Sequence, residues 1–171
     1  NGVAVLPIDI NKSERGFIAE ENGIRFAMLA VKSLGENAIA SIINERKTHG
    51  LFKSLQDFCF RMSGKELSTK AVEQLIKSGA MDCFPNNRHE MINAYDGLMQ
   101  SATQQNKNNL TGQLDFFGMA ESEPAEKEIE PCEEFPLKTL LEFEREAVGM
   151  YMSGHPLDDY SAVAAASGCV N

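Results

Sequence analysis

Between residues 29 and 101 the chain is divided into short helical segments by closely spaced capping and stop signals. Ser54–Asp57 is a capping box that predicts the start of one helix, and Ser68 caps another that stops at Gly79. The apolar residues that these two helices turn inward are Leu55, Phe58, Cys59, Val72, Leu75 and Ile76. Helices this short are stable only when packed against neighbours, so the signals predict one small, mainly helical core.

A β-hairpin is predicted ahead of these helices. The alternating segments Gly16–Glu20 and Gly23–Ala27 flank an Asn-Gly pair, which is the strongest short-range signal for two antiparallel strands. From Leu29 the apolar spacing becomes helical on both sides of Ser33-Leu34-Gly35, so two short helices are expected to meet at that turn.

Two further helices are expected towards the C-terminus. Asn87–Glu90 is a looser capping box, and its helix should fade into the Gln- and Asn-rich run after Ser101. An acidic linker of low order, Pro124–Pro136, then leads to an amphipathic helix that Gly154-His-Pro156 breaks. Its stripe at helical spacing, which includes one acid, is Leu137, Leu140, Leu141, Glu144, Ala147 and Val148. The fold class is mainly α with a small β-hairpin near the N-terminus.

The turn at Ser33 resembles the phosphate-binding turn of a helix-hairpin-helix module. Such a turn carries a glycine, a hydrophobic residue and a second glycine, because its backbone N–H groups must point together at a phosphate. Lys32-Ser33-Leu34-Gly35 fits this pattern with serine in place of the first glycine. A left-handed conformation would strain Ser33, so the serine is a departure from the pattern.

Lys77–Ala80 and the helix beyond Asn87 form a second, weaker version, in which Asn86 and Asn87 present amides and Arg88 and His89 face a phosphate. A helix, a glycine turn and a helix is a common way to end a helix, so either hairpin alone says little. Two in tandem predict a unit that holds a duplex backbone without reading its sequence. The candidate DNA-binding residues are Lys32, Ser33, Leu34, Gly35, Lys65, Lys70, Ser78, Gly79 and Arg88.

The charge distribution fits two functional halves. The formal net charge is −9, but residues 1–110 carry 13 Lys/Arg against 12 Asp/Glu, and residues 111–171 carry 3 against 13. The excess acid therefore belongs to the C-terminal part, where a run of glutamates is expected to be solvated.

No catalytic or metal-binding constellation is found in the sequence. The acids of the first half are scattered, and His49, His89 and His155 do not cluster. Four widely spaced cysteines lack a CxxC pair and are expected to be reduced thiols. No apolar run approaches the roughly 18 residues of a membrane span. We expect no catalytic residue, no metal and no membrane partner, and a cytoplasmic, nucleoid-associated protein.

An isolated apolar cluster lies at Gln113-Leu114-Asp115-Phe116-Phe117, between a polar run and the acidic tail. Such a segment has nothing local to pack against, so it is expected to be buried either in this protein's own core or in a partner's pocket.

Five blocks, in order over nearly the whole chain, resemble those of the bacterial C-family replicative polymerases, the DNA polymerase III alpha subunits. The blocks are residues 5–11, 24–35, 52–59, 75–82 and 150–157. The N-terminus lacks an initiating Met, and the chain reads as a piece of a longer protein.

The resemblance implies four regions. Residues 1–30 would be the end of the fingers with the β-hairpin, and 31–102 the tandem helix-hairpin-helix unit. Residues 103–135 would be a flexible segment with the motif and the acidic linker, and 136–171 a helix leading to an OB domain. The catalytic palm would lie upstream, so this region should be inactive alone and need no cofactor, while the parent polymerase would use Mg and dNTPs.

The resemblance also implies that residues 113–117 bind the sliding clamp, the beta subunit, with Gln113 as the orienting hydrogen-bonding residue and Leu114, Phe116 and Phe117 as apolar anchors. Other replicase subunits would be reached through the parent chain. Two alternatives stay open: a free-standing helix-hairpin-helix repair or recombination factor, and an interaction module that never touches DNA. Ser33 and the acidic tail favour the second mildly.

Overall fold

The computed structural model describes residues 2–110 and 127–154. These ranges contain three short strands, one 3₁₀ turn and five α-helices. In chain order they are β1 (Val5–Leu6), β2 (Ile18–Glu20), β3 (Gly23–Arg25), η1 (Met28–Ala30), α1 (Glu36–His49), α2 (Leu55–Met62), α3 (Thr69–Lys77), α4 (Arg88–Leu110) and α5 (Leu137–Val148). The mainly helical class with a small β element near the N-terminus is confirmed.

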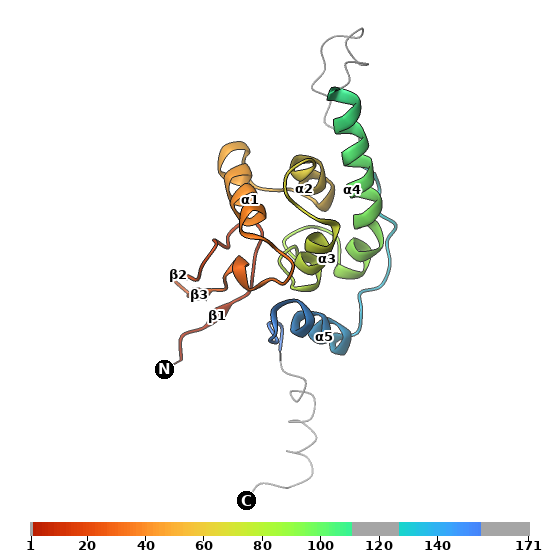
Figure 1. Cartoon of the computed structure of the whole chain (residues 1–171). Helices are drawn as coiled ribbons and strands as arrows, with labels where there is room; N and C mark the ends of the chain where they lie inside the picture. The colour runs from red at the N-terminus through yellow and green to blue at the C-terminus, as the bar shows by residue number, and fades with distance from the viewer. Residues whose placement is uncertain (1, 111–126, 155–171) are drawn as a thin grey trace, which may run out of the picture.

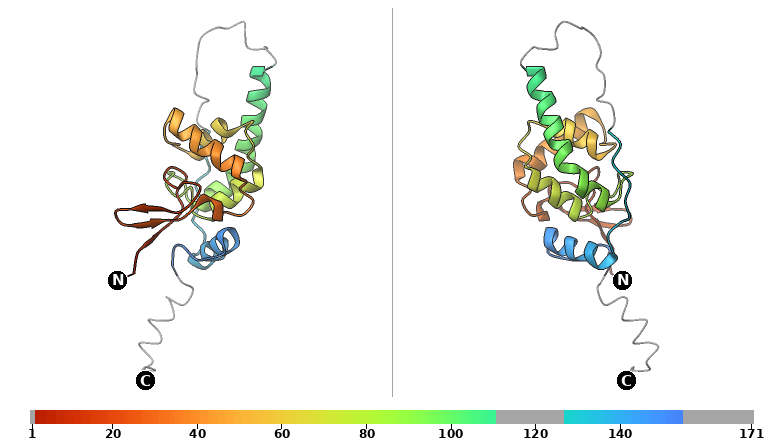
Figure 2. Two further views of the ribbon diagram at one scale, coloured as in Figure 1. Left: turned by 60° about the vertical axis from the view of Figure 1, so that its left-hand side comes forward. Right: turned by 90° about the vertical axis from the view of Figure 1, so that its right-hand side faces the viewer.

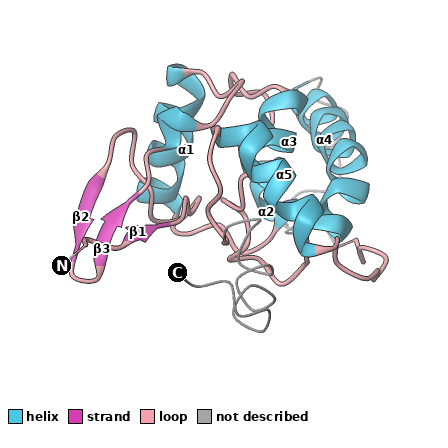
Figure 3. Cartoon of the chain, turned by 90° about the horizontal axis from the view of Figure 1, so that it is seen from below, coloured by secondary structure: helices cyan, strands magenta, loops and turns pink. Residues whose placement is uncertain are grey.

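The sheet has the order β1-β3-β2 and lies beside α1, to one side of the helices (Figure 1, Figure 3). The predicted hairpin is present: β2 and β3 are antiparallel, with Ala19 opposite Ile24. Strand β1, which the sequence pattern did not predict, pairs in parallel with β3. Gly23 has a φ of 152°, and a side chain there would overlap the Ala4 carbonyl, so glycine lets β1 approach.

The predicted helix starts are confirmed at α2 and α3. The Asp57 amide donates to Ser54 Oγ at 3.1 Å, and the Ala71 amide donates to Ser68 Oγ at 3.1 Å. All the inward-facing residues predicted for these two helices are buried. Together with the N-terminal segment, α1 and the first half of α4, they enclose one core with Phe58, Leu55 and Met62 at its centre.

The helices flanking the first turn differ from expectation. Before it there is only the single 3₁₀ turn η1, because Val31 is already extended with a ψ of 120°. After it, α1 turns Ala38, Ile39 and Ile42 into the core as its spacing predicts. The turn is therefore preceded by a single 3₁₀ turn and followed by a regular helix.

Helix α4 is longer than predicted, because it continues through the polar run to Leu110 instead of fading after Ser101. No Gly or Pro interrupts residues 98–110, and Gln and Lys are good helix formers. Asn106 Nδ2 also donates to the Ser63 carbonyl at 3.1 Å, which ties the extension to the end of α2. Helix α4 therefore projects beyond the other helices (Figure 1, Figure 2).

The expectation of low order is also wrong for residues 127–135. This segment, which we call the strap, runs extended along α4 down to α5 (Figure 1). Its Lys127 amide donates to Gln56 Oε1 at 2.7 Å, and its Ile129 packs against the core. Contacts with helices distant in sequence order it despite its acidic composition.

Helix α5 ends earlier than predicted, at Val148, since Gly149 takes a left-handed conformation with a φ of 89°. It packs against α3 and lies below it in Figure 1, with Leu141, Glu144 and Ala147 buried. Phe143, which is not part of the predicted stripe, contacts Phe135 edge to face, with ring centroids 5.2 Å apart. The helix is therefore an integral part of the helical unit.

Candidate nucleic-acid interface

The first hairpin is a tight, exposed turn between η1 and α1. Ser33 has a φ of 62°, and it is the only non-glycine residue with positive φ in residues 2–110 and 127–154. Leu34 is buried, whereas Lys32, Ser33 and Gly35 are exposed. The amides of Lys32 and Leu34 donate to the carbonyls of Ala147 and Val31, so the turn is tied to the fold at these two residues. Ser33 and Gly35 remain exposed, and Ser33 carries the strain that the serine pattern implied.

Helix α1 begins at this turn without a side-chain cap, and its N-cap residue is Gly35. The first N–H groups of a helix lack partners within the helix and lie at the positive end of its dipole. At α1 these groups follow exposed backbone, an arrangement that accepts an anion such as a phosphate.

The charges around the turn are compatible with an anion. The exposed Lys32 has no carboxylate within ion-pair distance in the part of the chain that the structure describes. Glu36, the acid in the first turn of α1, is paired with Arg15 at 3.0 Å, and both side chains are 63% exposed. Arg15, which sequence reasoning missed, therefore balances the nearest acid.

The second hairpin turn closes differently. After α3 the amides of Gly79 and Ala80 donate to the carbonyls of Ile76 and Leu75, both at 3.1 Å, and Gly79 has a φ of 82°. This is a Schellman ending, as the predicted glycine stop implies. The Ser78 hydroxyl is buried and donates to the Leu75 carbonyl at 2.8 Å. The Ser78 side chain therefore faces the interior of the turn.

Arg88 also faces the interior, which corrects the expectation that it faces a phosphate. Its side chain is 5% exposed and donates to both oxygens of Asp82, at 2.8 and 2.6 Å. It donates as well to Glu144 Oε1 at 2.9 Å. Two carboxylates hold the guanidinium over Gly79, so Arg88 joins the second hairpin to α5.

Glu144 is the centre of this buried ion pair. It is fully buried and accepts hydrogen bonds from the amides of Met152 and Ser153, at 2.6 and 2.8 Å, and from the Ser153 hydroxyl. Burial alone would raise the pKa of Glu144, but these hydrogen bonds and the Arg88 charge hold it below its usual value. One indication of this contact was present in the sequence, because Glu144 lies among the apolar residues of the predicted stripe of α5.

Helix α5 connects the two hairpins. Its Ala147 carbonyl accepts from the Lys32 amide at 2.8 Å, while its Glu144 binds Arg88. Glu144 and Ala147 lie three residues apart, about 4.5 Å along a helix. The two turns therefore lie on the same side of the molecule, held by adjacent turns of one helix.

The predicted capping box at α4 is present and reciprocal. The Glu90 amide donates to Asn87 Oδ1 at 2.9 Å, and the Asn87 amide donates to Glu90 Oε2 at 3.2 Å. The two intervening amides, of Arg88 and His89, donate to the Glu134 carboxylate of the strap, at 2.9 and 3.0 Å. The positions where the second hairpin was predicted to receive a phosphate are thus taken by an acid of the chain itself.

The two remaining predicted lysines lie away from the first turn. Lys65 pairs with the buried Glu45, nine residues beyond the start of α1 and therefore about 14 Å along its axis. Lys70, in the first turn of α3, pairs with Glu73 at 3.1 Å but remains 57% exposed. The structure does not gather the four predicted cations at one point, and only Lys32 adjoins an open hairpin.

The apolar cluster Gln113–Phe117 lies outside the described residues. Its two flanks are described: α4 ends at Leu110, and the chain resumes at Lys127, whose Nζ donates to Ser101 Oγ at 2.9 Å. The segment thus leaves from the projecting end of α4 and returns beside the same helix.

Within the described ranges, no group of three His, Cys, Asp or Glu residues could hold a metal ion. Burial raises the pKa of the Cys59 thiol to about 12, so this cysteine is a packing residue. No helix among the described residues is long and apolar enough to cross a membrane.

Comparison with known proteins extends these observations. A family model described as a helix-hairpin-helix motif matches residues 2–91, which include both turns and the start of α4. The chain belongs to the helix-hairpin-helix family.

Its relatives are DNA polymerase III alpha subunits. The chain is 39% identical to that of Deinococcus radiodurans over 96% of its own length, and 38% identical to that of Vibrio cholerae over 93%. The Escherichia coli K12 subunit is 35% identical over 93% of the chain. The chain spans only 12–14% of the length of these relatives. The resemblance to the DNA polymerase III alpha subunits is therefore confirmed, and the chain corresponds to a small part of these much larger relatives.

Proposed function

We propose that this region of a DNA polymerase III alpha subunit contacts the backbone of duplex DNA without reading its sequence. The observation that carries the proposal is the first hairpin: an exposed turn in a strained left-handed conformation, followed by an uncapped helix N-terminus and flanked by Lys32. A strained residue persists only where the surrounding fold imposes it, and such residues concentrate at functional sites.

The groups that line the first hairpin suit contact with the DNA backbone. Amides and one lysine at a turn can bind phosphates, which carry no sequence information. The affinity of such a contact falls steeply with salt, because each neutralised phosphate releases counterions.

The test is duplex binding by the chain with Lys32→Glu, compared with the same charge reversal at Lys53. Lys53 is exposed and follows the far end of α1, a helix about 21 Å long that begins at the turn. We expect Lys32→Glu to weaken binding about tenfold at low salt and to reduce the salt slope by about 1. Equal binding by the two variants would exclude the first hairpin, and no binding by the unmodified chain would favour the interaction-module alternative.

We also propose that residues 113–117 tether the polymerase to the sliding clamp. The support is the sequence Gln113-Leu114-Asp115-Phe116-Phe117, in which apolar anchors follow a glutamine, and the position of the segment between two fixed points on α4. A segment held at both ends loses less entropy on binding than a free tail. Combined with DNA contacts, even a weak anchor raises the time spent on the template.

Titration of a purified clamp with the chain and with its Phe116→Ala/Phe117→Ala variant tests the tether. We expect loss of about 100-fold or more in affinity when both anchors are removed, since hot-spot aromatics contribute about 2 kcal/mol or more each. The control is Phe17→Ala, which removes another exposed aromatic from the β-hairpin side. Unchanged clamp binding by the double variant would rule the tether out. Polymerase activity, with Mg and dNTPs, would belong to the rest of the parent chain.

A further inference from the structure

The strap is fixed to the start of α4 mainly by polar contacts. Asn87 Nδ2 donates to the Cys132 carbonyl at 2.8 Å, and the Cys132 amide donates to Glu90 Oε1 at 3.2 Å. His89 Nδ1 lies 2.6 Å from the Glu133 carbonyl, and the His89 ring stacks on Phe135 at 4.1 Å. With the Glu134 carboxylate, which accepts from the Arg88 and His89 amides, the contacts follow one another along four consecutive strap residues, Cys132 to Phe135.

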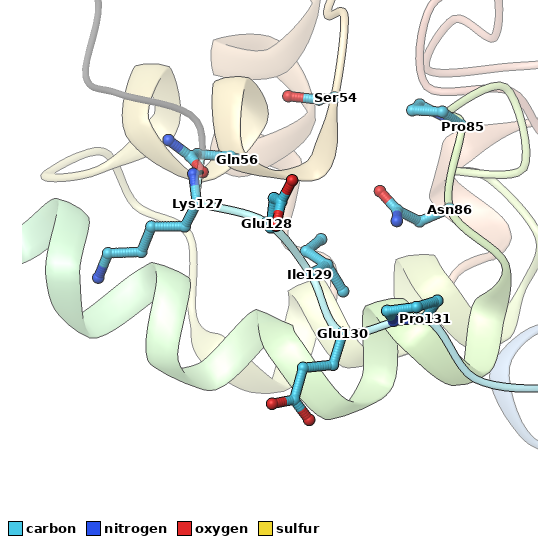
Figure 4. A pocket seen from close by; sticks show the side chains of 9 residues that line it. All are labelled: Ser54, Gln56, Pro85, Asn86, Lys127, Glu128, Ile129, Glu130 and Pro131. Atoms are coloured by element: carbon cyan, nitrogen blue, oxygen red, sulfur yellow. Dashed lines mark hydrogen bonds between the residues drawn. The ribbon is translucent and has the colours of Figure 1, made fainter.

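Figure 4 shows the beginning of the strap as an extended chain between the start of α2 and the 85–86 turn, bordering a pocket. Glu128, Glu130 and Pro131 are exposed there, and Ile129 is only partly buried. A segment with so little buried apolar surface belongs to the parts of a protein that open at low free-energy cost.

The strap places a carboxylate where a helix-hairpin-helix turn would place a phosphate. Glu134 accepts hydrogen bonds from the first two amides of α4, those of Arg88 and His89. The third amide, that of Glu90, donates to Asn87 Oδ1 in the capping box. Helix α1 offers a direct comparison in the same molecule: it starts after the first hairpin with no side chain on its amides. One of two tandem helix starts is open, and the other is closed by an acid from 46 residues later.

We propose that the strap is an autoinhibitory element of the DNA-binding surface. The Glu134 carboxylate holds the place at the N-terminus of α4 that a backbone phosphate takes when the strap is displaced. This proposal rests on the proposed function, and it names the second phosphate contact and its internal competitor. The closed state binds duplex through the first hairpin alone, and the open state binds through both.

The test is duplex binding by Glu134→Gln in the full 171-residue chain, with Glu130→Gln as the matched control. Both variants remove one negative charge from an exposed strap residue, but the Arg88 and His89 amides donate to Glu134 and not to Glu130. Releasing the competitor should tighten binding three- to tenfold at low salt and raise the salt slope by about 1. Glu130→Gln should change affinity less than twofold.

Equal affinities for the two variants would overturn the proposal, because Glu134 would then act only through net charge or as a helix cap. Lys32→Glu can also be combined with Glu134→Gln. If Lys32→Glu weakens duplex binding equally with and without Glu134→Gln, and Glu134→Gln alone gives no gain, the proposed function stands and the autoinhibitory role of the strap is excluded. No duplex binding by any variant refutes both.

A second measurement uses the unmodified chain and does not depend on how the variant folds. Amide resonances of residues 36 and 37 should shift at low duplex concentration, and those of Arg88 and His89 only at higher concentration, as the strap leaves. Shifts of all four amides at the same concentration would contradict an internal competitor.

Discussion

At the residue scale, Ser33 is the position where sequence and conformation conflict. A left-handed conformation costs a non-glycine residue about 1–2 kcal/mol, and Ser33 adopts it with a φ of 62°. The neighbouring Leu34 is buried under the turn and Gly35 starts α1, so the fold on both sides fixes the turn.

We therefore predict that Ser33→Gly stabilises the chain by about 1 kcal/mol, measured by urea unfolding. The matched control is Ser41→Gly within α1, where the same change should destabilise by about 0.5–1 kcal/mol because glycine is a poor helix former. Loss of stability at both positions would show that the left-handed Ser33 conformation is not strained.

Two glycines differ in the space around them. A Cβ at Gly79 would overlap the Arg88 guanidinium, and its φ is 82°, whereas nothing lies near a Cβ at Gly97 in α4. Gly79→Ala should destabilise by about 2 kcal/mol or more, and Gly97→Ala should stabilise by about 0.5–1 kcal/mol. Thermal unfolding of the two variants checks this, and similar shifts in Tm would contradict it.

At the element scale, the starts and inner faces of α2 and α3 could be predicted because their signals are local. Ser54 and Ser68 cap amides three residues away, and the apolar spacing names the buried face. The first hairpin could be located by its Ser-Leu-Gly pattern for the same reason.

Contacts distant in sequence could not be predicted. Glu134 reaches Arg88 across 46 residues, and Glu144 reaches it across 56. Nothing in an acidic run distinguishes the one glutamate that caps a helix from its solvated neighbours. For the same reason Arg88, basic and next to a turn, was predicted to meet a phosphate.

The Glu144 ion pair makes an element-scale prediction about pH. Its folded pKa lies below the usual 4.5, so its contribution to stability is complete above that value and is lost as pH falls through the folded pKa. Glu144→Gln should cost about 3 kcal/mol at pH 7, since it leaves buried partners unpaired. It should also flatten the decline in stability below pH 4.5.

Urea unfolding at pH 7 and at low pH checks both effects. Glu142→Gln, an exposed neighbour on α5, is the control and should change little at either pH. An equal acid slope in the Glu144 variant and the unmodified chain would exclude this carboxylate as the source.

At the scale of the whole molecule, α5 completes the packing that the first four helices begin, and the strap that leads to it adds one apolar contact. Leu141 and Ala147 are buried, and Ile129 and Val148 pack against the main cluster. A chain ending at residue 126 should therefore lose several kcal/mol of stability, because it exposes these faces and leaves Arg88 without Glu144.

Thiol labelling follows this change through one buried cysteine. Cys59 is 1% exposed and its pKa is raised to about 12, so it reacts only when the core opens. The labelling rate of Cys59 at neutral pH should rise at least tenfold in the shortened chain. A rate equal to that of the full chain would mean that α5 is an appendage.

The attachment of both hairpins to successive turns of α5 has a mechanical consequence. A force that tilts this helix displaces the Lys32 amide and the Arg88 guanidinium together, since Ala147 holds one and Glu144 the other. The two turns should therefore move as one rigid unit, with α5 as the link between them.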